Sequence, residues 1–182
     1  MILPTTYMGS VEWYRQFMTN PSHVAIEVME SFPKQTYRNR CTITIPVGNE
    51  SINGKLLTLS VPVKRADSKQ LTRDVEISYQ QKWQHQHWIA LVSAYKRTPY
   101  FDYYADFFRP FYEKETKFLI DLNEGLHDVI VRLLTNEAWR LEGEKARRTS
   151  DWMGIDLEST FGNGQSILDL LFEYGPETIM KI

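Results

Sequence analysis

A short polar stretch, "KQTYRNRC" at residues 34–41, concentrates groups that could hold an anion. It contains three cations, Lys34, Arg38 and Arg40, in a chain whose formal net charge is only −2. Side chains alternate along a strand, so Arg38 and Arg40 would share one face if this stretch enters a strand. Two neighbouring guanidinium groups repel each other unless an anion lies between them, and guanidinium forks fit carboxylate or phosphate oxygens. The spacing therefore suggests a clamp for a sugar-nucleotide diphosphate or a substrate carboxylate.

The alternative is structural. Acidic side chains of the same chain could neutralise these cations, and Glu27, Glu30, Asp74 and Glu76 are the candidates. Structural ion pairs gather charge just as binding sites do. From the residues alone this alternative is the favoured one, and both stay open at this point.

His87 is the second residue that could do chemistry. Because a histidine titrates near neutral pH, it could serve as a general base or acid. On a helix it would share a face with Leu91 and Ala94 and point inward, whereas His85 would point outward into solvent. Two histidines spaced in this way cannot lie on one helix face, so we expect no metal site here. The favoured alternative for His87 is an imidazole at the edge of the core, bonded to a backbone carbonyl.

The loop that follows the first apolar run offers hydroxyl groups from Thr5, Thr6 and Tyr7. Ligands of open α/β sheets lie at the carboxyl ends of strands, and a helix N-terminus favours anions. This loop could therefore bind a phosphate or a sugar. The sequence contains no GxGxxG, GxxxxGK[ST] or GxSxG motif, so we expect no nucleotide cofactor of a standard type and can assign no enzyme class from motifs.

Cys41 is the single cysteine of the chain, which excludes an internal disulfide and a zinc site built from several thiolates. It alternates with Ile43 and Ile45 and so belongs to the apolar side of its strand. A thiol in such surroundings stays protonated. We therefore do not expect Cys41 to act as a nucleophile.

Composition narrows the class of protein. The 182 residues suit a single domain with a sizeable core. The near-neutral charge argues against a nucleic-acid partner, and no apolar run is long enough to span a membrane. The first residues lack the features of a signal peptide, so a cytoplasmic protein is expected. Four further aromatic residues could either cover a homo-oligomer interface or pack in the core, and both alternatives stay open. They are Tyr100, Tyr103, Phe107 and Tyr112.

The elements that would position these groups begin with strands. A strand at about 2–7, a helix at 11–18 and a strand at 24–28 predict a βαβ unit with parallel strands. Alternating residues at 41–45 and 57–63 predict a hairpin with a long loop at 46–55, and 75–79 a fifth strand. The fold class expected is α/β, a mixed sheet of about five strands packed with several helices, with α+β as the alternative.

The second half of the chain has helical periodicity. Helices are expected at 82–97, at 101–113 with a kink or end at Pro110, and at 114–134. A short amphipathic helix is expected to start at Ser166 and to be ended by Gly175 and Pro176. We divide this single-domain protein into a main α/β domain at 1–135 and a helical C-terminal arm at 136–182 that docks on it.

Several segments together resemble one family of bacterial proteins. They are "LPTTYMGSVEWY", "KQTYRNRCTI", "LTLSVPV", "KWQHQHWIALVSAYKRTPYFDYY" and "SILDLLFEYGP". In this order they cover almost the whole chain. As a set they resemble the WbqC-like protein family, which is encoded among genes for O-antigen and other surface polysaccharides.

The resemblance implies a transferase of surface-polysaccharide biosynthesis that moves a glycyl or other small acyl or amino group to or from an activated sugar. In that case Lys34, Arg38 and Arg40 would bind the diphosphate or a carboxylate of the donor, and His87 would be the base. The resemblance also implies a pocket lined by five further residues: Tyr7, Asn39, Trp83, Trp88 and Tyr95. The alternative is a non-catalytic sugar-nucleotide-binding or scaffold protein.

Overall fold

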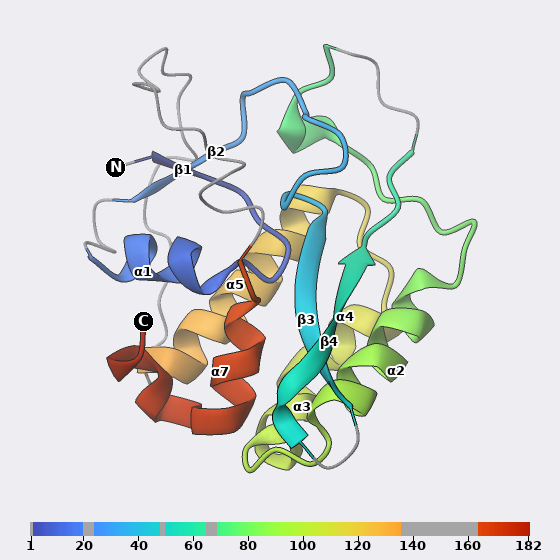
Figure 1. The fold of residues 1–182 in the computed structure, drawn as a ribbon. Helices are drawn as coiled ribbons and strands as arrows, with labels where there is room; N and C mark the ends of the chain where they lie inside the picture. The colour runs from blue at the N-terminus through green and yellow to red at the C-terminus, as the bar shows by residue number, and fades with distance from the viewer. Residues whose placement is uncertain (1, 20–23, 48–49, 65–68, 136–163) are drawn as a thin grey trace.

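The computed structural model describes residues 2–19, 24–47, 50–64, 69–135 and 164–182. Strands dominate its first third and helices the rest (Figure 1). In chain order the elements are β1 (Ile2–Pro4), α1 (Val11–Thr19), β2 (Ala25–Glu27), β3 (Arg40–Val47), β4 (Glu50–Ser60), the 3-10 helix η2 (Thr72–Asp74), α2 (Trp83–Tyr95), α3 (Phe101–Phe108), α4 (Pro110–Glu113), α5 (Leu119–Thr135), α7 (Ile167–Tyr174) and the 3-10 helix η3 (Gly175–Met180).

The βαβ unit is confirmed. β1 and β2 pair in parallel, with Leu3 opposite Ile26, and α1 connects them. Trp13, Tyr14 and Phe17 are buried on one face of α1, which follows from their helical spacing. The unit therefore brings the loop after β1 and the start of α1 into the body of the protein.

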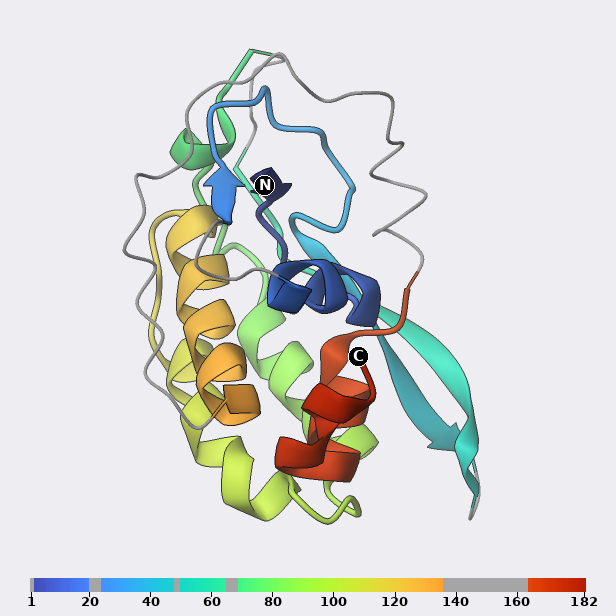
Figure 2. The ribbon, with the colours of Figure 1, turned by 90° about the vertical axis from the view of Figure 1, so that its left-hand side faces the viewer.

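The hairpin is also confirmed, but it is longer than predicted. β3 and β4 pair antiparallel from Arg40 opposite Ser60 as far as Val47 opposite Glu50, through most of the segment expected to be a loop. The register shifts between Ile45 and Val47, at Pro46, which has no N–H group to donate to a strand pair. In Figure 2 the hairpin lies on the side of the molecule opposite to α5.

The predicted five-stranded sheet is wrong for the residues that the structure describes, which form two separate two-stranded sheets. Val75 and Ile77 are buried as their alternation suggested. Their segment, however, makes only isolated bridges, Val63 with Ile77 and Glu76 with Phe118. The alternating apolar side chains of this segment are buried between two neighbouring segments. Such burial does not require the backbone to form a continuous strand. The mixture of helices and strands still fits α/β or the α+β alternative.

The helices mostly follow their predicted periodicity. Pro110 separates α3 from α4, as expected of a residue that lacks a backbone donor. α5 begins at Leu119 and not near 114, because Lys114 is extended. Its residues Leu119, Leu126 and Ile130 are fully buried.

The C-terminal helix α7 is capped by Ser166, whose Oγ accepts a hydrogen bond from Leu168 N. Phe172 of α7 lies against Tyr95, Phe101 and Phe108, with ring centroids 4.7 to 5.6 Å apart. α7 is thus part of the same hydrophobic core as α2 and α3. The predicted division at residue 135 remains a prediction, and most of the predicted arm, 136–163, lies outside the described residues.

Candidate functional site

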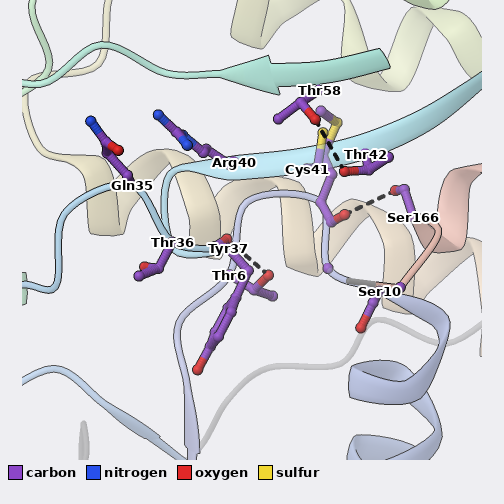
Figure 3. Close-up of a pocket in the computed structure, with 13 residues that line it drawn as sticks. Thr6, Ser10, Gln35, Thr36, Tyr37, Arg40, Cys41, Thr42, Thr58 and Ser166 are labelled. Carbon is purple, nitrogen blue, oxygen red and sulfur yellow. Dashed lines mark hydrogen bonds between the residues drawn. The ribbon is translucent and has the colours of Figure 1, made fainter. Parts of the chain in front are cut away.

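A cavity of about 230 Å³ lies where five separate segments meet. The segments are the loop after β1, the turn at 35–37, the start of β3, the facing end of β4 and the residues before α7 (Figure 3). Most side chains that line it are polar and uncharged. The lining is Thr6, Met8, Gly9, Ser10, Gln35, Thr36, Tyr37, Arg40, Cys41, Thr42, Thr58, Gly164 and Ser166.

Two of these residues have unusual backbone conformations. Met8 has φ 46° and Gln35 has φ 64°, the only positive φ values among the described residues other than glycine. Residues with a side chain rarely adopt this region, and such strain persists only where the surroundings hold it. Ser166 Oγ donates a hydrogen bond of 2.9 Å to the Met8 carbonyl and so fixes one of them. Because strained residues concentrate at functional sites, their meeting at one cavity supports a role in binding.

The two strained loops are also tied to each other. Tyr7 N and Thr6 Oγ1 both donate to the Tyr37 carbonyl, at 3.0 and 3.3 Å. These bonds hold the two loops in place, and a lining held in this way lowers the entropic cost of binding.

Two helices begin at the cavity. Ser10 Oγ accepts a hydrogen bond from Trp13 N at the start of α1, and Ser166 Oγ does the same for Leu168 N at the start of α7. Helix N-termini carry partial positive charge. These two helix ends therefore add partial positive charge at the cavity, although the chain as a whole is nearly neutral.

Of the described residues that line this cavity, Arg40 alone is charged. It is half-buried, its Nε donates to Ser60 Oγ at 3.3 Å, and it forms no ion pair with any residue that the structure describes. In Figure 3 the polar ends of Arg40 and Gln35 lie on the same side of the cavity. A guanidinium with free donors beside a polar cavity can accept a carboxylate or phosphate group.

Arg38 has a different environment. It is buried, and it makes a two-pronged ion pair with Glu30: Nε lies 2.5 Å from Oε1 and Nη2 lies 2.8 Å from Oε2. The guanidinium also lies over the ring of Tyr37, 4.7 Å from its centroid. Arg38 does not line the cavity, and Lys34 is exposed and does not line it either. Of the three predicted clamp cations, the structure places Arg40 alone at the cavity.

His87 is buried behind the cavity wall. Its Nδ1 lies 2.8 Å from Tyr7 OH, which in turn lies 3.0 Å from Tyr112 OH. Burial lowers the pKa of His87 to about 4, and a hydrogen bond to the Ser60 backbone opposes that shift. Burial, with the neighbouring Tyr112, also raises the pKa of Tyr7. At neutral pH the imidazole and both phenols are therefore uncharged, and they link α2, α4 and the first loop.

The other predicted pocket residues also lie in the core. Asn39 Nδ2 donates to the Val61 carbonyl at 2.9 Å, and Tyr95 OH donates to Asp169 Oδ1 at 2.5 Å. Trp83 packs edge-on against His87, and Trp88 is half-buried against Tyr112. None of these residues lines the cavity that contains Arg40.

Cys41 does line the cavity but is not activated. Burial, with the charge of Asp169 as a second cause, raises the pKa of its thiol well above the ordinary value. The thiol is therefore protonated at neutral pH, in line with the sequence-based expectation.

A family model matches the chain from residue 11 to residue 151, and its description is "WbqC-like protein family". This chain belongs to the WbqC-like protein family. Neither the curated proteins nor the solved structures contain a match. In this WbqC-like chain the matched part supplies one wall of the cavity, from Gln35 to Thr42 together with Thr58, whereas Ser10 and Ser166 lie outside it.

Two further observations concern metal ligands and membrane-spanning helices among the described residues. The described residues contain no group of three or more His, Cys, Asp or Glu side chains placed to hold a metal ion. Of the described helices, none combines the length and the apolar character that crossing a bilayer requires.

Sequence analysis missed part of this lining. Thr42 and Thr58 face each other across the hairpin, with their hydroxyl oxygens 3.4 Å apart, and Ser166 comes from a segment more than a hundred residues away. The threonines alternate with apolar residues, a signal that marks one polar face of the hairpin. No local signal predicts which distant segment covers that face.

Proposed function

We propose that this chain binds a small, hydroxyl-rich anion, such as the phosphorylated sugar part of a surface-polysaccharide precursor, in the cavity beside Arg40. The observation that carries the proposal is the combination of a guanidinium that pairs with no carboxylate among the described residues and a wall of hydroxyl groups held by hydrogen bonds. Arg40 would bind the phosphate or carboxylate oxygens. Threonine and serine hydroxyls both donate and accept hydrogen bonds, so they suit the hydroxyl groups of a sugar.

The size of the cavity limits what can enter it. Pockets for drug-sized ligands measure about 300–1,000 Å³, and this cavity measures about 230 Å³. We therefore propose that it encloses one part of the ligand, the sugar or the phosphate, while the remainder of an activated sugar lies outside.

The transfer of a glycyl or other small acyl or amino group to or from the sugar is the finer proposal, and family membership supports it. On this structure His87 would act only through Tyr7, because the imidazole is buried and bonded to that phenol. Cys41 would remain a protonated thiol. The geometry thus supports ligand binding better than catalysis by these two residues.

Binding is tested by thermal unfolding with four probes: inorganic phosphate, glucose, glucose 1-phosphate and a uridine diphosphate hexose. A ligand at 100 times its dissociation constant adds about 2.7 kcal/mol of stability. For a chain of this size that corresponds to a rise in Tm of about 5–10 °C. We expect such a rise with a phosphorylated sugar and a smaller one with glucose.

Arg40→Gln should abolish the rise, and Lys55→Gln, which removes an exposed cation from the same hairpin, should leave it unchanged. The single thiol gives a second readout: glucose 1-phosphate should slow the reaction of Cys41 with a thiol reagent. A rise in Tm that persists in Arg40→Gln contradicts the assigned site. Turnover of an acyl donor by the wild type would favour the transferase, whereas binding without turnover would favour the binding protein.

A further inference from the structure

A second polar site lies between α5, α1 and the loop after β1. Asn123 and His127 lie one helical turn apart on α5, and their side chains point the same way because residues four apart share a helix face. Both are buried, with 2% and 6% of their surface exposed. Each side chain has one polar atom that is bonded and one that is not.

The hydrogen bonds of the Asn123 amide determine which of its two polar atoms is the acceptor. Asn123 Nδ2 donates to Thr5 Oγ1 at 3.1 Å and to the Arg38 carbonyl at 2.8 Å. Because a carbonyl only accepts, the amide orientation is settled, and Asn123 Oδ1 is an acceptor with no partner among the described residues.

The contact between His127 and Tyr14 bears on the tautomer of the imidazole. Burial raises the pKa of Tyr14, so its phenol keeps its proton, and His127 Nδ1 lies 3.3 Å from that oxygen. Burial also lowers the pKa of His127 to about 4, so the imidazole is neutral. If Tyr14 donates its proton to Nδ1, then Nε2 carries the hydrogen. Nε2 is buried and has no partner among the described residues.

Asn123 and His127 both line a small cavity of about 10 Å³. Its other lining residues are Thr5, Thr6, Trp13, Ile26 and Glu124. This volume is close to the smallest space that holds one water-sized group, about 10–15 Å³ on the same measure. Leaving two buried polar atoms unsatisfied is costly, and a single group between them would satisfy both.

From this geometry we infer that the cavity is a binding site for one uncharged hydroxyl group, which donates to Asn123 Oδ1 and accepts from His127 Nε2–H. The group is either a water molecule or a hydroxyl of a bound ligand. With His127 in the Nε2–H tautomer, an ammonium group does not fit because it has no lone pair to accept from Nε2–H, and an ionised carboxylate or phosphate does not fit because it has no hydrogen for Oδ1. The inference does not depend on the Arg40 cavity, which lies on the other side of Thr6.

The test is nitrogen and proton NMR of the imidazoles in the full chain. We expect His127 to be the Nε2-protonated tautomer, with a proton that exchanges with solvent at least about tenfold more slowly than that of the exposed His85. Cross-relaxation from Nε2–H to a bound water proton would identify water as the occupant. A change of this signal on adding glucose 1-phosphate would identify a ligand hydroxyl.

A variant gives an independent measurement. His127→Phe keeps a ring of similar shape and removes the donor, so magnetic relaxation dispersion of water should lose one long-lived water, whereas His85→Phe should lose none. If His127→Phe does not fold, the wild-type spectrum decides. An Nδ1-protonated His127, or an Nε2–H without contact to water or to a ligand hydroxyl, would overturn the inference.

Discussion

The ion pair between Arg38 and Glu30 gives the sharpest test of which arginine has a structural role. We expect Arg38 to stabilise the fold and Arg40 to contribute little to stability. The side chain of Arg38 is 6% exposed and that of Glu30 is 21% exposed. Glu30→Ala would leave the guanidinium buried without its carboxylate. The ring of Tyr37 and Thr36 Oγ1 would remain beside it, but neither carries a compensating charge.

The expected magnitude follows from burial. Breaking a buried ion pair by removing one partner costs about 3–5 kcal/mol. We expect the lower end, about 3 kcal/mol, since Glu30 retains some contact with solvent that screens the pair. For a chain of 182 residues this corresponds to a fall in Tm of about 6–12 °C. Arg40→Gln removes a half-buried cation that pairs with no described carboxylate, so it should change stability by less than about 1 kcal/mol.

The assay is urea unfolding of the wild type, Glu30→Ala, Arg40→Gln and the double variant Glu30→Met with Arg38→Met. Replacing both partners of a buried pair with apolar residues is often neutral or stabilising. We therefore expect the double variant to unfold at a higher urea concentration than Glu30→Ala. If Glu30→Ala has wild-type stability while Arg40→Gln unfolds readily, the structural role of Arg38 and the binding role of Arg40 are both assigned wrongly.

Two further predictions concern buried titratable groups. The pKa values of His87 and His127 are lowered to about 4 in the folded protein, below the ordinary value of about 6.5. The unfolded chain therefore binds more protons between these values, and stability should fall as the pH falls from about 6.5 to about 4. Each histidine contributes up to about 1.4 kcal/mol per pH unit to that slope. His87→Gln should reduce the slope of unfolding free energy against pH, measured by urea titration, whereas His85→Gln should not. Tyr95→Phe removes the donor to the half-buried Asp169 and should cost about 1.5–3 kcal/mol in the same assay at pH 7; no change would show that the carboxylate does not need this bond.

Local patterns predicted the elements that local interactions stabilise. The stripe of α1, the hairpin and the break at Pro110 all follow from side-chain periodicity or from a missing backbone donor. The fifth strand failed for the opposite reason, because Val75 and Ile77 are buried by segments that come from elsewhere in the chain. Sequence alternation shows that a residue is buried, and only the tertiary structure shows whether its backbone has a strand to pair with.

The same limit explains the predicted clamp. Alternation placed Arg38 and Arg40 on one face, but β3 begins at Arg40, and Arg38 lies in the preceding turn. The alternation of side chains along a strand therefore does not determine the direction of Arg38, whose side chain forms an ion pair with Glu30. The sequence-based alternative included Glu30, which does pair with Arg38, among the candidate partners. It could not predict which arginine would be neutralised.

The Arg40 cavity depends on contacts that close only in the complete fold. Ser166 N donates to the Thr42 carbonyl, Ser166 Oγ donates to the Met8 carbonyl, and Ile167 N donates to the Gly9 carbonyl. The start of α7 thus joins the hairpin to the first loop across most of the length of the chain. Because the lining comes from segments this far apart in sequence, an unfolded chain presents no such site, and a ligand that binds here selects the folded state. If the proposed anion binds beside Arg40, its binding should therefore be coupled to stability through the contacts of Ser166.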